Sequence, residues 1–481
     1  MKRKHQSLKR NLAVLVSGLV FATSASALSL EDYLGQVKDS SMGYKANSEQ
    51  AEAANLKTRE ADLFFTPRLF ANARAGFDGK EPFGSTITYD ELKMQNYSLG
   101  ISQEFSFGLQ ASLAYAMDRT QIVGATLPAG ISDTFWDATP KLELTMPLWA
   151  NGFGRSSRAN EQVTRQQNLA DRFGSAAQAH AYLVQAEAAY WGLVSAQEVV
   201  EVQGRALEQA KSILNYVTRK SRMNLGERAD ILQAKALVES TTFQLQQAQN
   251  REKAARRAFN TYVNRPAETA VDKLEGINFV NLQNISVPQQ QPGDRLDIKA
   301  AEAQSLMAKS AAQLSNERNK PTLDLYGSYA LNGRDEELNE ALKEAGAVER
   351  DTAFVGVRLN IPLNYGAASD AQTGALKAQK AAEYSYQYKR FTQEQDWTNL
   401  TQQLVEAKES LRLATNIVNA QKAKLENERV RQRQGRTTTY QVLLFEQEFS
   451  QSEVNRIQAA SQILGLQAQI KLYQASLEGG I

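Results

Sequence analysis

The chain of 481 residues has no cysteine and only two histidines, His5 and His180. Without thiols it can form no disulfide, thiolate metal site, cysteine nucleophile or lipid-modified cysteine. Two histidines argue against zinc hydrolase chemistry and against a histidine-based catalytic triad. The 55 Lys and Arg residues nearly balance the 53 Asp and Glu residues, so no strong positive field points to nucleic acid. We therefore expect no enzyme, no metal, no cofactor and no nucleic-acid partner.

Long apolar segments are also scarce, although 42% of the residues are hydrophobic. The mean hydropathy of −0.46 excludes a bundle of membrane-spanning helices. Residues 12–22 are apolar, follow five basic residues and precede Ala25-Ser26-Ala27, which predicts a secretory signal peptide over residues 1–27. A retained membrane anchor is the alternative. Because no later segment offers about 18–20 consecutive apolar residues, any membrane insertion of the remaining chain must use strands.

Proline is rare and unevenly placed. The ten prolines are absent from residues 148–265 and 363–481, two tracts of 118 and 119 residues that are rich in good helix formers. Each tract follows a segment that contains proline, so the sequence indicates a duplicated unit. Pro67 and Pro147 are 80 residues apart and Pro321 and Pro362 are 41 apart, which places 80 − 41 = 39 additional residues in the first copy.

Apolar and polar residues alternate in the segments between these prolines, a pattern that predicts strands. The expected strands cover about 67–77, 140–149, 321–330 and 352–363, with an additional hairpin at about 96–120 that turns near Gly108. Strands with one apolar and one polar face suit a membrane β-barrel with a wet lumen, and equally a soluble sandwich with one solvated face. The signal peptide favours the barrel.

The proline-free tracts have helical spacing. The column His180, Trp191, Val202 and Ile213 repeats every eleven residues, which allows nearly straight helices. A helix over 155–224 would be about 105 Å long, a length that suits a tube and that a globular core does not need. His180 lies in this packed column, so we interpret it as a buried neutral histidine.

The expected organisation is then as follows. A first repeat covers 28–265, with helices at 28–64, 155–224 and 230–263; a linker covers 266–292; and a second repeat covers 293–481, with helices at 293–318, 366–434 and 440–475. Each long helix ends at a glycine turn, at Gly226 and at Gly435, where glycine supplies the left-handed residue after the helix. Asp230 or the threonines 437–439 could cap the returning helices.

Several sequence motifs resemble those of the TolC-type outer-membrane efflux protein (outer membrane factor) family. The resemblance covers nearly the whole chain after residue 27. The motifs are Leu28-Ser29-Leu30-Glu31-Asp32-Tyr33, Pro67-x-Leu69, Met146-Pro147-Leu148 with Gly152-Phe153-Gly154-Arg155, Arg295-x-Asp297-Ile298, Pro321-x-Leu323, Asp230-Ile231-Leu232-Gln233-Ala234 and Gln441-Val442-Leu443.

The resemblance implies a mostly α-helical chain with a membrane β-barrel part, located in the outer membrane with a long periplasmic extension. Three copies would each give four strands to a 12-stranded barrel that continues into a periplasmic α-helical barrel. The additional hairpin at 96–120 leaves the number of strands open, because it would either extend the barrel or project outside the cell. The protein would be the passive exit duct of a tripartite efflux or type I secretion system. Its partners would be outer-membrane lipid, a periplasmic adaptor protein and an inner-membrane pump of the RND or ABC type that supplies the energy.

The resemblance also assigns roles to individual residues. The periplasmic gate would contain Glu227, Asp230 and Gln441, and the four strand–helix junctions would lie at Pro67, Pro147, Pro321 and Pro362. The turns that dock the adaptor would contain Leu225, Gly226, Leu232, Gly435, Val442 and Leu443. Gln441 and Leu444 stand where family members often have acidic residues, so Asp230, with Glu227 nearby, would provide the negative charge; a capping role for Asp230 fits equally well.

Two other functional classes compete with the duct. A secreted elongated helical scaffold or adhesin without channel activity would use the strands in a soluble domain. An exported enzyme could use a pair of carboxylates, as glycosidases do, but the acidic residues have the spacing of helix surfaces. The sequence does not specify the transported substrate.

Overall fold

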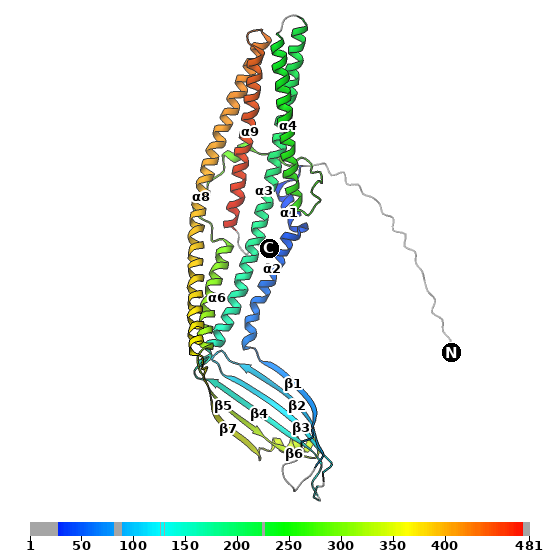
Figure 1. Cartoon of the computed structure of the whole chain (residues 1–481), viewed down its shortest axis with the longest axis vertical. Helices are drawn as coiled ribbons and strands as arrows, with labels where there is room; N and C mark the ends of the chain where they lie inside the picture. Colours follow the sequence, from blue (N-terminus) through cyan, green and yellow to red (C-terminus); the bar gives the residue numbers. More distant parts are fainter. Residues whose placement is uncertain (1–26, 81–88, 126, 129, 224–226, 475–481) are drawn as a thin grey trace, which may run out of the picture.

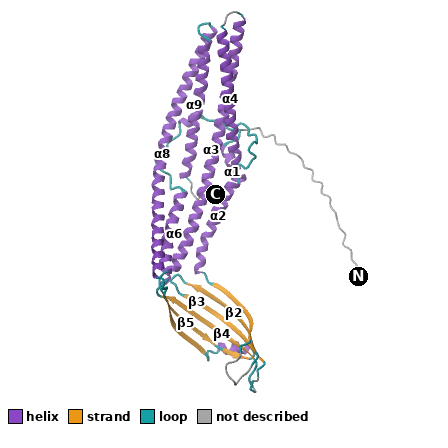
Figure 2. Ribbon diagram, viewed as in Figure 1, coloured by secondary structure: helices purple, strands orange, loops and turns teal. Residues whose placement is uncertain are grey.

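The computed structural model describes residues 27–80, 89–125, 127–128, 130–223 and 227–474. A layer of long helices and a curved antiparallel sheet lie end to end in this part of the chain (Figures 1 and 2). Residues 1–26 of the expected signal peptide, and both Leu225 and Gly226, lie outside it. Among the helices described, none combines the length and the apolar character needed to cross a membrane.

Two helices run the full length of the helical region. They are α3 (Arg155–Arg222) and α8 (Tyr365–Arg433), with 68 and 69 residues. At 1.5 Å per residue each is about 100 Å long. Neither contains a proline, and both end close to the bounds expected from the proline-free tracts.

Shorter helices accompany each long one. These are α2 (Met42–Lys57), α4 (Arg228–Tyr262), α6 (Leu296–Arg318) and α9 (Thr439–Ile470). Helices α2 and α4 pack along successive parts of α3, while α6 and α9 lie between α3 and α8 and contact both (Figure 1). The helical region is therefore a single curved layer, four helices wide at every level.

The largest apolar core of the described residues joins α1 (Leu30–Ser40), α3, α4, α8 and α9. Tyr33 of α1 is fully buried; its ring stacks on Phe259 at 4.1 Å and its hydroxyl donates to the Phe259 carbonyl oxygen at 3.1 Å. Tyr190 of α3 packs on the same pair and donates to the carbonyl oxygen of Leu28 at 2.8 Å. Burial raises the pKa of the Tyr33 phenol, and raises that of Tyr190 to about 12, so both remain hydrogen-bond donors.

The segment expected as a linker, 266–292, is packed rather than free. Its residues Leu274, Ile277 and Leu282 are buried in the same core, and it contains the short helix α5 (Phe279–Gln283). Leu274 also forms a parallel bridge with Leu28. The prolines at both ends of the segment and the glutamines at 289–291 predict a loop, but they do not reveal that its apolar residues are buried.

The helix expected over 28–64 is interrupted at Ser41. The Ser41 N–H closes α1 by donating to the Val37 carbonyl oxygen, and its backbone is extended. Its hydroxyl oxygen accepts from the Tyr44 N–H and starts α2, while the hydroxyl donates to Tyr182 at 2.7 Å. A serine that satisfies both helix ends makes the break stable. The last part, Thr58–Phe65, is a 3₁₀ helix, η1.

Six long strands form one antiparallel path in the order β1-β2-β3-β4-β5-β7. Their bounds are β1 (Arg68–Asp78), β2 (Glu91–Glu104), β3 (Gln110–Val123), β4 (Thr134–Pro147), β5 (Thr322–Leu331) and β7 (Asp351–Asn360). A short strand, β6 (Gly333–Asp335), pairs with β4, and helix α7 (Leu338–Gly346) packs beside it. The hairpin expected at 96–120 covers 91–123 and lies inside the sheet, between β1 and β4, so the sheet has more than the four strands that the resemblance implies.

Strand β4 begins at Thr134, six residues before the expected start at Pro140. Pro140 has no N–H and is rarely tolerated inside a sheet. On one side of β4, residues from Lys141 onward pair with β5, and residues up to Ala138 pair with β6. Pro140 lies between these two pairings. This gap accommodates a residue without a donor.

We predict that the Tyr33 contacts stabilise the helical region. Tyr33→Ala should lower the free energy of unfolding by about 3–5 kcal/mol, because it removes a fully buried ring. Tyr33→Phe should cost only about 1 kcal/mol, the net value of one hydrogen bond. Urea unfolding followed by circular dichroism at equal protein concentration measures both. Equal losses for the two variants would contradict the prediction.

Candidate functional site

One face of the sheet is apolar and exposed. Leu69 of β1, Ile101 of β2, Leu113 of β3 and Leu142 of β4 lie in one continuous row, because each is paired in register with the next. Leu69 is 76% exposed. Further exposed apolar residues of the same face are Leu99, Leu144, Leu325, Tyr329, Val355, Val357 and Leu359. An apolar surface that crosses every long strand is a membrane or protein interaction surface.

The opposite face is polar. By register it carries Arg74, Asn96, Asp118, Asp137, Lys141, Glu143, Asp324 and Arg358. These groups pair with one another: the Asn96 side-chain amide donates to Asp118 at 2.8 Å, and Lys141 lies 2.6 Å from Glu143. Such a face suits contact with water. The strands have 10 to 14 residues, enough for the roughly 9–11 that cross a bilayer.

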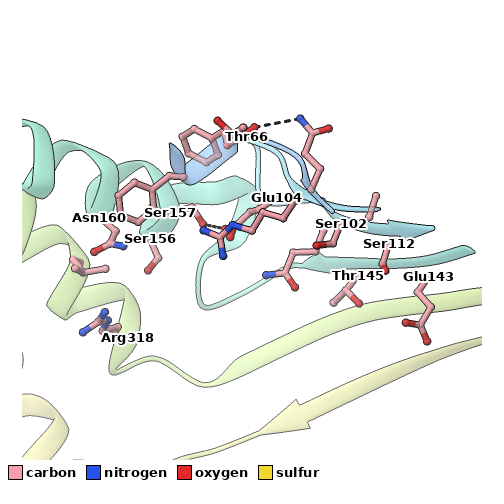
Figure 3. A pocket seen from close by; sticks show the side chains of 17 residues that line it. Thr66, Ser102, Glu104, Ser112, Glu143, Thr145, Ser156, Ser157, Asn160 and Arg318 are labelled. Atoms are coloured by element: carbon pink, nitrogen blue, oxygen red, sulfur yellow. Dashed lines mark hydrogen bonds between the residues drawn. The ribbon is translucent and has the colours of Figure 1, made fainter. Parts of the chain in front are cut away.

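The polar face ends in a hollow where the sheet meets the helices (Figure 3). Its volume is about 540 Å³, and Glu104, Ser112, Glu143 and Thr145 project into it from three neighbouring strands. Asn160 of α3 and Arg318 of α6 line its helical end. The polar surface thus continues from the strands onto the helices.

The turn of the β2–β3 hairpin is locked onto the start of α3. Gly108 and Gly154 approach so closely that a Cβ on Gly154 would lie 2.2 Å from the Ser106 carbonyl oxygen. The Arg158 guanidinium donates to that same oxygen at 2.7 Å, and the Ser157 hydroxyl donates to Glu104. The hairpin is therefore fixed at its helical end.

The β4–α3 connection needs unusual backbone. Asn151, Phe153 and Gly154 all have positive φ, between 54° and 76°, a region that only glycine adopts without cost. The Asn151 side-chain oxygen accepts from the Ser156 and Ser157 N–H groups and caps α3. Asn364 does the same at the start of α8, where it accepts from the Ala367 N–H. Neither asparagine was predicted from the sequence, although an asparagine directly before a helix, as Asn364 is, signals a cap.

The four predicted junction prolines lie near this boundary. Pro67 and Pro321 directly precede β1 and β5, Pro147 is the last residue of β4, and Pro362 follows β7 by two residues. Pro147 is buried, and its ring carbon is the nearest side-chain atom to the Gly108 Cβ position, at 3.3 Å. Each proline ends or begins a strand where no further ladder donor is needed.

The other end of the helical layer is the tip, the ends of α3 and α8 and the starts of α4 and α9 (Figure 1). The left-handed conformation expected at Gly435 is confirmed, with φ of 71°. The Gly435 N–H donates to the Gln432 carbonyl and the Arg436 N–H to the Arg431 carbonyl, which closes α8. Glu428, which is 5% exposed, accepts from the Thr437 hydroxyl and pairs with Arg431 at 3.1 Å.

The predicted gate residues occupy the first turns of the returning helices. Glu227 is exposed at the start of α4, Asp230 is half-buried one turn further, and Gln441 is half-buried in α9. Asp230 is not the capping residue, because it lies inside α4 and Glu227 holds the capping position. Its carboxylate instead lies near the positive end of the helix dipole. Thr438 caps α9 by accepting from the Gln441 N–H.

The predicted docking residues separate into two groups. Leu232 is 59% exposed and Gly435 is exposed. Val442 and Leu443 are buried and pack against Ile213 of α3, so in the isolated chain their side chains do not lie on an exposed surface. An apolar pair in a turn looks the same in the sequence whether it faces a partner or a neighbouring helix. Leu225 and Gly226 lie outside the described residues.

The tip is basic, a property that was not predicted from the sequence. Its exposed arginines are Arg219, Arg222, Arg228, Arg431, Arg433 and Arg436. Residues 219–230 and 428–441 together hold eight Lys and Arg and three Asp and Glu, a net 8 − 3 = +5 per chain. Most of these basic residues end α3 and α8, where they complement the negative end of the helix dipole.

An ion pair joins the two helices of the second half below the tip. Arg429 of α8 donates to Glu446 of α9 at 2.5 and 2.7 Å. Burial raises the pKa of Glu446, although Arg429 opposes the shift. Loss of Arg429 would leave a buried carboxylate without its partner.

His180 occupies the packed position expected for it. It is half-buried in α3, and burial, with a smaller contribution from Lys38, lowers its pKa. The residues described include no group of three or more His, Asp or Glu side chains placed to hold a metal ion.

Among known proteins, the chain matches solved structures but no family model and no curated sequence. Solved structures match: the outer-membrane channel OprN (TM-score 0.64, 18% identity, covering 92% of this chain and 89% of OprN) and the outer membrane protein VceC from Vibrio cholerae (0.64, 15%, 93% and 96%). The MtrE outer membrane channel of Neisseria gonorrhoeae, solved in its open state, also matches (0.62, 18%, 93% and 89%).

At these identities the likeness establishes a shared fold. The resemblance to TolC-type outer-membrane channels that the sequence predicted is confirmed for the fold, over more than nine tenths of the chain.

We predict that close glycine contact fixes the junction of sheet and helices. Gly154→Ala should lower the thermal midpoint by several degrees, because it adds a clash of 2.2 Å to the cost of positive φ, about 1–2 kcal/mol. Gly130→Ala is the matched control: Gly130 has φ of 91° and nothing within 4 Å of its Cβ position. Circular dichroism melting measures both variants, and midpoints lowered equally would show that the contact contributes nothing.

Proposed function

We propose that three copies of this chain form a water-filled exit duct in the outer membrane. The sheet crosses the lipid, with its apolar face outward and its polar face toward the lumen. The helical layers of the three copies enclose a tunnel that extends through the periplasm. The duct conducts passively and performs no covalent chemistry.

A single observation carries this proposal: the sheet has two chemically opposite faces, and its polar face continues without a break onto helices about 100 Å long. A soluble scaffold would not need an apolar face that is exposed along six strands. The shared fold with OprN, VceC and MtrE, described as outer-membrane proteins and channels, points the same way.

The duct needs partners at its tip, because nothing in the proposed mechanism supplies energy. We assign this role to a periplasmic adaptor protein and an inner-membrane pump of the RND or ABC type, in a system for efflux or type I secretion. The exposed Leu232 and Gly435 would belong to the docking surface. Glu227, Asp230 and Gln441 would line the gate, where three copies of Asp230 form a ring by symmetry.

The first test separates a duct from a secreted scaffold. The full chain, purified from outer membranes, is reconstituted in planar lipid bilayers. A trimer with small, long-lived conductances is the expected result. Recovery as a soluble elongated monomer that gives no conductance would overturn the proposal and favour the scaffold.

We predict that Asp230 controls the closed tip. Asp230→Ala should raise the resting conductance several-fold and shift the ion selectivity further toward anions, because it removes three negative charges from a basic surface. Glu239→Ala is the control, since Glu239 is an exposed carboxylate further along α4. Planar-bilayer current and reversal potential report both properties. Unchanged values for Asp230→Ala would end the gate assignment while leaving the duct intact.

A further inference from the structure

The two ends of the sheet path are open. Strand β1 pairs only with β2, and β7 only with β5. Nearly all their residues are exposed, including Leu69 and Phe77 of β1 and Val355 and Val357 of β7. Neither strand contains proline, which commonly protects a sheet edge. An edge of ten or eleven residues with apolar side chains therefore requires another strand.

The two edges are complementary. Strand β1 runs away from the helices, whereas β7 runs back toward them (Figure 1). Laid side by side, β7 of one copy and β1 of the next are antiparallel, like every other pair in the sheet. Both carry their apolar residues on the same outward face. A second copy of this chain thus fits each edge without a break in the pattern.

The β2–β3 hairpin has every property of the wall. It pairs with β1 over residues 92–102 on one side and with β4 over residues 110–121 on the other. Its outward face continues the apolar band through Leu99, Ile101 and Leu113, and its inward face carries Ser98, Ser112 and Asp118. Its turn is fixed against α3 through Gly108 and Gly154. A hairpin that projected away from the membrane would need none of these features.

We propose that three copies close edge to edge, β1 on β7, into a barrel of 3 × 6 = 18 strands. This inference rests on the proposed trimeric duct and specifies its exit. With strands about 4.8 Å apart and tilted about 40°, 18 strands give a backbone diameter of about 36 Å, against about 24 Å for 12.

The wider barrel also fits the helical layer. Three copies place 3 × 4 = 12 helices side by side at any level. At about 10 Å between axes, such a ring is about 38 Å across. The strand barrel and the helical barrel then have similar diameters where they join. The strand barrel is therefore not the narrowest part of the duct.

Cysteine labelling tests whether the hairpin is part of the wall, and the absence of native cysteine makes each introduced thiol unique. In trimers reconstituted in liposomes, Ser98→Cys should react with a membrane-impermeant maleimide on the order of tenfold faster than Leu99→Cys, which should face lipid. Glu143→Cys and Leu142→Cys on β4 are the matched controls. Alternation on β4 without alternation on β2 would overturn the 18-strand barrel and leave the duct; alternation on neither would reject both.

Closure is tested by oxidation. Ala73→Cys in β1 is combined in turn with Ala353→Cys, Val355→Cys and Val357→Cys in β7, all on the outward face. One of the three combinations should give covalent trimers on a denaturing gel. Efficient formation of trimers without any of these cross-links would show that the edges do not meet, and would overturn the proposal.

Discussion

The proposed duct depends on one constraint, that every backbone N–H and C=O group of a strand surrounded by lipid must have a partner. Within one chain β2 to β5 meet it, since each is paired on both sides, and β1 and β7 do not. The alternation of side chains gives the sheet its two faces, but the unpaired edges decide how copies associate. The glycine contact and the Arg158 hydrogen bond at the hairpin turn hold the inserted strands at the level where pairing continues.

Sequence patterns predicted the helices and strands whose formation depends on residues close together in the chain. The proline-free tracts gave the long helices, and alternation gave most strands, because periodicity reflects burial within a single element. The predictions failed where contacts with another segment of the chain determine the local structure. Pro140 is tolerated inside β4 because β4 changes its partner strand from β5 to β6 at that point. Ser41 interrupts the helix because its hydroxyl accepts from the Tyr44 N–H and donates to Tyr182. That the hairpin lies inside the sheet follows from its register with β1 and β4, which no window of sequence contains.

The candidate site divides in the same way. The glycine turn at Gly435 could be predicted, since only glycine readily adopts the conformation that ends α8. The burial of Val442 and Leu443 could not, because it depends on Ile213, more than two hundred residues earlier. The six exposed arginines of the tip were visible in the sequence, yet their concentration appears only when the ends of α3 and α8 lie together. The tip that would surround Asp230 is therefore strongly basic.

The single-layer helical region has a thermodynamic consequence. In the described part of the chain an excess of large apolar side chains is exposed, among them Leu69 in the sheet and Tyr388 and Phe391 on α8. A lone copy has no second layer on which to bury this excess. In the proposed trimer the folded state gains much of its free energy from contacts between copies, so the midpoint of a denaturation curve should depend on protein concentration. Dilution alone should then act as a denaturant.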